Sequence, residues 1–314
     1  MSTEERRRAR KMETDKVGFV GVGNVGRHMA GNLVARGFDV LVSDAAPGRA
    51  EQFAAERRAT AVREPRELGS ATAIVTMLPN GDVVREVILE SGLADALAPG
   101  SLVIDTSSSD PLGTRSLGDE LAARGISLVD AGVSMPVGGR AADRMITFMV
   151  GVDDDATYER ACVYLDAMGD QIFRLGPRGA GHTMKTLNNY IGASGKAAAL
   201  DALVIGGKLG LDPAMMLDVL NVSTGRNFNT QHPLRERAIN GRFDSGYALA
   251  LLVKDLRIAR RVAERAQLES PLFELLERQY AEALEALGGG GIDHLAALRH
   301  WEQRAGVTVA PEAS

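Results

Sequence analysis

The chain has 314 residues, 45% of them hydrophobic and 25% charged, which is typical of a globular protein long enough for two domains. Its formal net charge of −5 argues against a surface that binds nucleic acid or an anionic membrane, because both require concentrated positive charge. No stretch approaches the roughly 18 uncharged apolar residues that span a bilayer, which argues against a membrane protein.

The N-terminal segment 1–15 contains arginines and acidic residues, and no apolar stretch follows them. A secretory signal requires such a stretch, and a transit peptide is poor in acids, so we expect a disordered tail and a cytoplasmic protein. The single cysteine, Cys162, excludes an internal disulfide and a cysteine-cluster metal site. The five histidines lack the paired spacing of metal ligands, and no metal is expected.

Short β-branched runs alternate with helical segments from residue 16 to 177. Strands are predicted at 17–22, 39–44, 72–78, 101–106 and 126–131. Their continuous apolar character is expected where helices cover both faces of a parallel sheet, and Gly37 and Gly125 are predicted helix ends. The alternation predicts an α/β Rossmann-type, doubly wound N-terminal domain over 16–177. A further strand is expected at 145–151, with antiparallel pairing left open.

The turn after the first predicted strand carries a G-x-G-x-x-G pattern formed by Gly21, Gly23 and Gly26. The first glycine permits the tight turn, the second lets a pyrophosphate approach the backbone, and the third lets helix and strand pack closely. The following helix N-terminus offers N–H groups to phosphates. We therefore predict dinucleotide binding by these glycines together with Asn24 and Val25.

Asp44 ends the next predicted strand, 23 residues after Gly21. A carboxylate at this point accepts hydrogen bonds from the ribose hydroxyls of the adenosine and repels a 2′-phosphate, which favours NAD over NADP. Arg49 lies close enough in sequence to leave the strictness of that preference open.

Beyond residue 176 the strand signals stop, and a glycine-rich segment at 176–181 leads into helical patterns. Helices are predicted at 181–209, 213–221, 246–267, 271–287 and 292–304. We therefore predict an all-α C-terminal domain over 178–304, followed by a tail at 305–314. We assign substrate binding and assembly to this domain, because apolar faces on its helices are expected to suit a homodimer or homotetramer.

Lys185 and Asn189 lie four residues apart near the start of the first of these helices and share one face. One interpretation makes the lysine a solvated charge and the asparagine a cap. The other follows from the position of the helix directly after the nucleotide domain, where its first turns should border an interdomain cleft. A lysine there can exchange a proton with a hydroxyl or carbonyl group.

Six motifs in chain order resemble the β-hydroxyacid dehydrogenase family, which includes 3-hydroxyisobutyrate dehydrogenase and tartronate semialdehyde reductase. They are GFVGVGNVGRHMAGNL, MLPN, IDTSSSDP, DAGVS, GHTMKTLNN and LLVKDLRIA, spread between Val17 and Trp301. The resemblance implies a dehydrogenase in which Lys185 is the catalytic general acid or base and Asn189 binds substrate. It also implies that Ser108 lines the nicotinamide site.

The same resemblance places Leu78 and Pro79 along the dinucleotide. Lys254 corresponds to a lysine that reaches cofactor and substrate; taken alone, it is better explained as a helix-surface lysine paired with Asp255 or nearby acids. Ser134 is the residue of the DAGVS motif predicted to bind the substrate carboxylate, through its hydroxyl or the neighbouring N–H groups.

The chain departs from the family pattern D-A-P-V-S-G-G after residue 130. Gly132 replaces the proline, and Met135 and Pro136 replace the two glycines. Since proline has no N–H group and methionine adds bulk, we expect a reshaped substrate pocket and leave the exact substrate open. Arg226 lies near a predicted helix end and is a hypothetical ligand for a second carboxylate or another anionic group.

The sequence thus predicts an NAD-dependent dehydrogenase of a small β-hydroxy acid, or a reductase of its semialdehyde, acting through Lys185. Two alternatives stay open: an imine reductase of the same two-domain plan, and a non-catalytic dinucleotide-binding module. A prominent lysine is not expected as the proton donor of an imine reductase, and a module without catalysis has no need of it.

Overall fold

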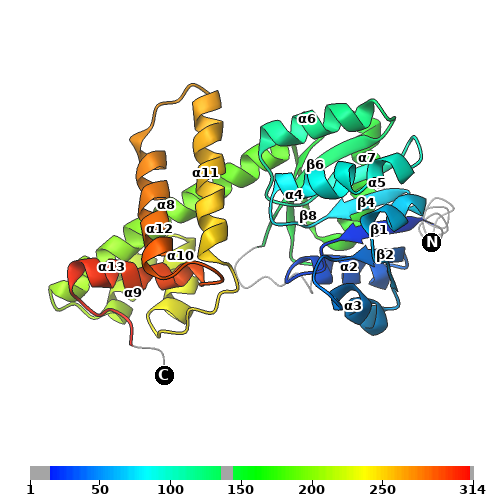
Figure 1. Cartoon of the computed structure of the whole chain (residues 1–314). Coiled ribbons are helices and arrows are strands. Elements are labelled where there is room, and N and C mark those ends of the chain that lie inside the picture. Colours follow the sequence, from blue (N-terminus) through cyan, green and yellow to red (C-terminus); the bar gives the residue numbers. More distant parts are fainter. Residues whose placement is uncertain (1–14, 136–143, 312–314) are drawn as a thin grey trace. The chain divides into compact units, whose positions relative to one another are not determined.

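A computed structural model describes residues 15–135 and 144–311 (Figure 1). The chain forms two units: unit 1 ends at Lys185 and unit 2 begins at Thr186. Helix α8 (Ala180–Lys208) continues across this division. Pro136 and nearly all of the predicted tail at 1–15 lie outside the described residues.

Unit 1 is built on one eight-stranded sheet with the order β3-β2-β1-β4-β5-β6-β7-β8. The strands are β1 (Lys16–Val20), β2 (Asp39–Ser43), β3 (Thr60–Ala61), β4 (Ala73–Thr76), β5 (Leu102–Asp105), β6 (Ser127–Ser134), β7 (Thr147–Gly151) and β8 (Gln171–Gly176). All neighbouring strands are parallel except β6 and β7. The predicted doubly wound fold is confirmed, and the strand expected at 145–151 pairs antiparallel.

Helices cover both faces of this sheet because its strands bury side chains on both sides. On one face α2 (Gly26–Ala35), α3 (Arg49–Arg57) and α7 (Asp155–Met168) pack on a core that includes Phe19 and Val75. The other face is covered by η1 (Pro65–Ser70), α4 (Gly81–Arg85), η2 (Glu86–Glu90), α5 (Leu93–Ala96) and α6 (Pro111–Ala122), around Ile74 and Leu68 (Figure 1). The carboxyl ends of the parallel strands therefore form the open edge where loops can bind ligands.

Unit 2 consists of helices packed around a separate core that includes Leu200, Leu256 and Tyr280. Besides the remainder of α8 they are α9 (Pro213–Asn221), α10 (Phe228–Gln231), η4 (Leu234–Ala238), α11 (Leu249–Arg265), α12 (Pro271–Ala286), η5 (His294–Ala296) and α13 (Ala297–Ala305). Helices α11 and α12 form a hairpin (Figure 1). Within the described part of the chain, no helix combines the length and apolar character needed to cross a membrane.

Residues after α13 fold back on it, although the sequence analysis assigned 305–314 to a tail. Glu302 is buried and accepts hydrogen bonds from the N–H groups of Val309 and Ala310 at 2.6 and 2.7 Å. Arg299 donates to the carbonyl oxygen of Ala310 at 2.8 Å. The buried carboxylate and this guanidinium therefore anchor the segment up to residue 311.

Candidate active site

The glycine-rich turn between β1 and α2 has the geometry required to hold a dinucleotide. Gly21 has a φ of +95°, which L side chains rarely adopt. A Cβ atom added to Gly26 would overlap the carbonyl oxygen of Gly21, whereas one added to Gly23 would meet open space. Helix α2 has no side-chain cap and no acidic residue in its first turn. Its positive N-terminal end therefore suits a phosphate.

Asp44 follows β2 and is held against the glycine turn. Its Oδ2 accepts the N–H of Val22 at 2.9 Å, and its Oδ1 accepts the N–H of Ala46 at 2.8 Å. Arg49 forms an ion pair with Oδ1 at 3.2 Å, and the carboxylate is only 6% exposed. Beside it lies a cavity of about 370 Å³ lined by Val22, Gly23, Asn24, Arg27, Arg49, Gln52, Phe53 and Glu56.

The other residues assigned to the cofactor lie in loops at the carboxyl ends of β4 and β5. The N–H of Leu78 donates to the Oγ of Ser107 at 2.9 Å, which ties the two loops together. A side chain on Gly21 would come within 3.1 Å of Leu78 Cδ2, so this leucine lies against the glycine turn. Pro79 is exposed and Ser108 half-buried. Unit 1 thus brings these residues to one edge of its sheet.

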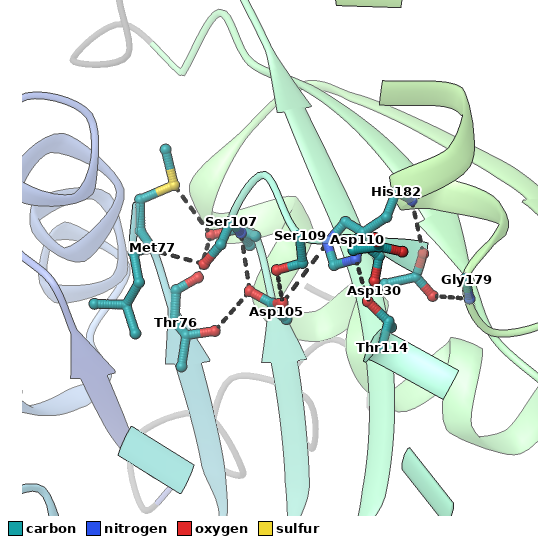
Figure 2. A network of polar contacts seen from close by, with 12 residues as sticks. Thr76, Met77, Asp105, Ser107, Ser109, Asp110, Thr114, Asp130, Gly179 and His182 are labelled. Carbon is teal, nitrogen blue, oxygen red and sulfur yellow. Dashed lines mark hydrogen bonds and ion pairs between the residues drawn. The ribbon is translucent and has the colours of Figure 1, made fainter. Parts of the chain in front are cut away.

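Figure 2 shows a buried polar network at the same edge, which the sequence analysis did not nominate. Asp105 ends β5 and accepts hydrogen bonds from Thr76 Oγ1, the N–H of Ser107 and Ser109 Oγ at 2.7–2.9 Å. The ring of His182, also fully buried, hydrogen-bonds Thr114 Oγ1 through Nδ1 at 2.7 Å. Its Nε2 lies 3.8 Å from Asp105 Oδ2.

Lys185 lies on the second turn of α8 and packs against β6. A Cβ atom added to Gly132 would lie 2.6 Å from Lys185 Cβ and 3.2 Å from its Cγ. The glycine that replaces the family's proline therefore gives the lysine stem room to approach the strand. Ser134, two residues further, ends β6 half-buried, and Met135 is 40% exposed.

In unit 2 the predicted substrate residues Asn189 and Lys254 both contact Asp255. The amide nitrogen of Asn189 donates to Asp255 Oδ2 at 2.7 Å, and Lys254 Nζ lies 2.9 Å from Oδ1. Tyr247 donates its hydroxyl to Oδ2 at 2.5 Å. Burial and this carboxylate raise the pKa of Tyr247 well above its usual value, so it remains a donor. Asp255 thus orients the Asn189 amide.

Arg226 is exposed in the turn before α10, and among the described residues it takes no part in the contacts of Asp255. Its neighbour Asn227 caps α10, accepting the N–H groups of Asn229 and Thr230. The structure therefore brings Asn189 and Lys254 together but leaves Arg226 outside their group.

A second buried polar group lies further along α8. The side-chain nitrogen of Lys196 contacts Nδ1 of His294, and both residues are buried. Burial lowers the pKa of Lys196 to about 7, opposed by Asp293. Burial and the neighbouring Lys196 lower the pKa of His294 well below its usual value. Both groups are therefore largely neutral in the folded protein above pH 7.

Sequence reasoning could have found part of what it missed. Asp105 and Asp130 end or interrupt apolar strands of a parallel sheet, where an ionisable residue is an exception that calls for partners. Asp255 directly follows Lys254, and its sequence position alone indicates only a surface partner for that lysine. Tyr247 and His294 carry no such signal, because they lie outside the recognised motifs.

Comparison with known proteins agrees with the fold and the glycine turn. Residues 16–176 match the family model described as the NAD binding domain of 6-phosphogluconate dehydrogenase. Residues 179–301 match the model described as NAD-binding of NADP-dependent 3-hydroxyisobutyrate dehydrogenase. The two matches together cover most of the chain.

Individual relatives extend the similarity over nearly the whole length. The chain is 31% identical to 2-(hydroxymethyl)glutarate dehydrogenase of Eubacterium barkeri, over 94% of this chain and 97% of that protein. It is 31% identical to 3-sulfolactaldehyde reductase of Escherichia coli, over 93% and 97%. A solved structure of Mycobacterium tuberculosis 3-hydroxyisobutyrate dehydrogenase with L-serine has a TM-score of 0.79 and 31% identity, covering 91% of this chain and 98% of that one.

Proposed function

Since this chain belongs to the β-hydroxyacid dehydrogenase family and is a nicotinamide-dependent oxidoreductase acting on hydroxyl groups, we propose that it oxidises a small β-hydroxy acid or reduces the corresponding semialdehyde. Lys185 is the proposed general acid and base. The observation that carries this role is the close packing of the Lys185 stem against Gly132, at the strand that ends in Ser134.

A dinucleotide held by the glycine turn and Asp44 would supply the hydride chemistry, taking a hydride from the β carbon in oxidation and giving one to it in reduction. Lys185 takes the hydroxyl proton during oxidation and returns a proton to the oxygen during reduction, a role that contributes about 10²–10⁴-fold in rate. Ser134 and Lys254 bind the substrate's anionic group. Asn189 hydrogen-bonds the substrate, held in orientation by Asp255. Arg226 is proposed as a ligand for a second anionic group.

The names of the relatives suggest the substrate class. Each enzyme acts on a molecule that combines an anionic carboxylate or sulfonate with a terminal alcohol or aldehyde. The exposed Met135 stands where the family has a glycine, which supports a pocket that differs from that of 3-hydroxyisobutyrate dehydrogenase. We therefore propose a terminal β-hydroxy acid and leave the anionic group to experiment.

NAD is the proposed cofactor in preference to NADP. Asp44 is fixed beside the glycine turn by two backbone N–H groups, so its charge stays next to the cavity there. Arg49 forms an ion pair with this carboxylate and partly offsets the repulsion of a 2′-phosphate. The expected result is a preference for NAD with measurable use of NADP.

We also propose that unit 2 mediates assembly into a homodimer or homotetramer. Large apolar side chains are exposed on α8 and α9 and just beyond them, which is unusual for a surface that stays in water. They are Ile191, Ile205, Leu209, Met215, Val219 and Val222. Light scattering on the purified protein tests this assignment, and a monomer would contradict it. The cytoplasmic location and the domain limits at 178 and 304 remain predictions.

A substrate panel tests the proposed activity. It contains 3-hydroxyisobutyrate, L-serine, 2-(hydroxymethyl)glutarate and 3-sulfolactaldehyde, with a cyclic imine as the alternative substrate. Each is assayed with NAD(H) and NADP(H), and turnover is followed by the absorbance of reduced nicotinamide. Lys185→Ala should lose turnover of any accepted compound while cofactor binding persists, and Lys208→Ala, an exposed lysine of the same helix, serves as control. Turnover of a cyclic imine alone would favour an imine reductase. Cofactor binding without any turnover would favour a non-catalytic module.

A further inference from the structure

The N-terminal end of helix α8 is held by a carboxylate from another strand. Asp130 lies within β6 and is fully buried. Its Oδ1 accepts the N–H of Gly179 at 2.6 Å, and its Oδ2 accepts the N–H of His182 at 2.8 Å (Figure 2). A carboxylate at a helix N-terminus satisfies N–H groups that lack a partner within the helix and interacts favourably with the helix dipole. Asp130 thus caps the helix that carries Lys185.

Two glycines make this close approach feasible. A Cβ atom on Gly181 would overlap the carbonyl oxygen of Met149 and lie 2.9 Å from Asp130 Oδ2. A Cβ atom on Gly151 would lie 2.5 Å from Asp130 Oδ1 and 2.8 Å from the nitrogen of Ala180. The first turn of α8 therefore lies directly on β6 and β7, with its register fixed by the carboxylate.

His182 joins this cap to the loop that follows β5. Its main-chain N–H donates to Asp130, while its ring lies between Thr114 and Asp105. The ring Nε2 is buried without a hydrogen-bond partner among the described residues, 3.8 Å from Asp105 Oδ2. Asp105 in turn holds Ser107, whose hydroxyl accepts the N–H of Leu78. A continuous chain of contacts therefore links the cofactor loops to the start of α8.

We propose that Asp130 and His182 are positioning residues that fix Lys185 relative to β6 and to the cofactor loops. Lys185 follows His182 by three residues on the same helix, and its stem packs against Gly132, two residues after Asp130. A shift at the helix cap therefore moves the lysine relative to the strand that ends in Ser134. This inference rests on the proposed role of Lys185 in catalysis.

Asp130→Asn tests the cap with little change in volume. An amide retains one acceptor oxygen, but its NH₂ group faces the second backbone N–H and cannot accept from it. We expect kcat to fall by about 100-fold, the loss that a displacement near 1 Å produces in a catalytic group. The Kd for NAD should stay within about twofold, because the glycine turn is untouched. In hydrogen exchange, the peptide covering 179–185 should lose protection.

His182 supplies a second test through a pair of variants. His182→Leu removes both ring nitrogens and should lower kcat, whereas His182→Asn keeps a polar group near the position of Nδ1, the ring atom that hydrogen-bonds Thr114, and should restore most of it. Leu68→Ala is the matched control: it truncates a buried side chain in the core on the α6 face of unit 1, lowers Tm, and should leave kcat unchanged.

The primary deuterium isotope effect on kcat separates positioning from loss of folded protein. With an accepted substrate deuterated at the β carbon, such as 3,3-dideutero-L-serine, the isotope effect should rise in Asp130→Asn because the chemical step becomes slower. A smaller folded fraction lowers kcat without changing the isotope effect. A fall in kcat that matches the folded fraction, with the isotope effect of the wild type, would overturn the proposal.

The experiments distinguish failure of the proposed catalytic role of Lys185 from failure of the proposed positioning role of Asp130 and His182. If Lys185→Ala loses turnover but Asp130→Asn retains kcat within threefold, the proposed function stands and the positioning role is wrong. If the wild type turns over no hydroxy acid or aldehyde of the panel, the proposed function fails. Hydrogen exchange of the peptide 179–185 then tests separately whether Asp130 caps helix α8. Unchanged protection in Asp130→Asn overturns it, and faster exchange confined to that peptide supports it.

Discussion

Replacing the buried Lys196 with methionine is expected to stabilise unit 2 at neutral pH. The folded-state pKa of this lysine is about 7, lowered by burial from the 10.5 of an exposed lysine. Between these values the unfolded chain binds a proton that the folded protein does not. The free energy of unfolding therefore rises as the pH increases from 7 to 10.5 and falls as the pH decreases. Below pH 7 the folded protein bears the whole energetic cost of burying this lysine.

The magnitude follows from the two pKa values. Their difference is 10.5 − 7, or about 3.5, and at about 1.36 kcal/mol per pH unit this costs folding about 5 kcal/mol once fully expressed. At pH 7 the lysine is half protonated in the folded state, and the cost is about 4 kcal/mol. Methionine removes this cost but leaves His294 Nδ1 without its contact, a loss of about 1–3 kcal/mol. The expected net gain is about 1–3 kcal/mol.

Trp301 provides the assay, because it is the chain's single tryptophan and lies in the core of unit 2. Its ring centroid is 5.5 Å from that of Tyr280, over which Lys196 lies, so its fluorescence follows unfolding around the lysine. The free energy of unfolding, measured in urea at several pH values from 7.5 to 9.5, should rise with pH in the wild type. This rise should be steeper than that of Lys196→Met by about 1.4 kcal/mol per pH unit. Lys208→Met should behave as the wild type. Equal slopes in the wild type and Lys196→Met, or a loss of stability in that variant at pH 7, would refute the reasoning.

Three further substitutions test the predicted site. Gly26→Ala places a methyl group on the carbonyl oxygen of the first glycine in the turn, so the Kd for NAD measured by calorimetry should rise at least about tenfold. The control variant Gly113→Ala, where a Cβ meets open space, should bind NAD with the affinity of the wild type. Asp44→Ser should reduce the ratio of kcat/KM with NAD to that with NADP by about tenfold or more, and an unchanged ratio would remove the assigned role. Gly132→Ala brings a Cβ within 2.6 Å of Lys185 Cβ. The kcat should therefore fall by about tenfold or more, while the affinity for NAD is retained. A kcat equal to that of the wild type would show that the lysine has room to move.

Periodicity and glycine spacing predicted the doubly wound sheet because those signals are local. Apolar runs predicted six of the eight strands, and Gly37 and Gly125 end helices with positive φ, as expected. The missed strands lack such signals: β3 has only two residues, and β8 is a mostly exposed edge strand. Helices α10 and η4 were also missed, since they span four and five residues and show no helical period.

The polar contacts of the site could not be predicted in the same way, because they join residues distant in sequence. The sequence identifies Asp130 and His182 as members of two motifs, but only the fold brings the carboxylate to the helix cap 52 residues later. The contact of Lys196 with His294 likewise spans 98 residues. An isolated lysine in an alanine-rich helix gives no indication that it is fully buried.

The most direct test of the central claim is a crystal structure of the protein with NAD and an accepted hydroxy acid, in which the distance from Lys185 Nζ to the substrate hydroxyl oxygen is measured. The account predicts a hydrogen bond of about 3 Å. A lysine directed into solvent, with another group bound to that oxygen, would contradict the proposed chemistry.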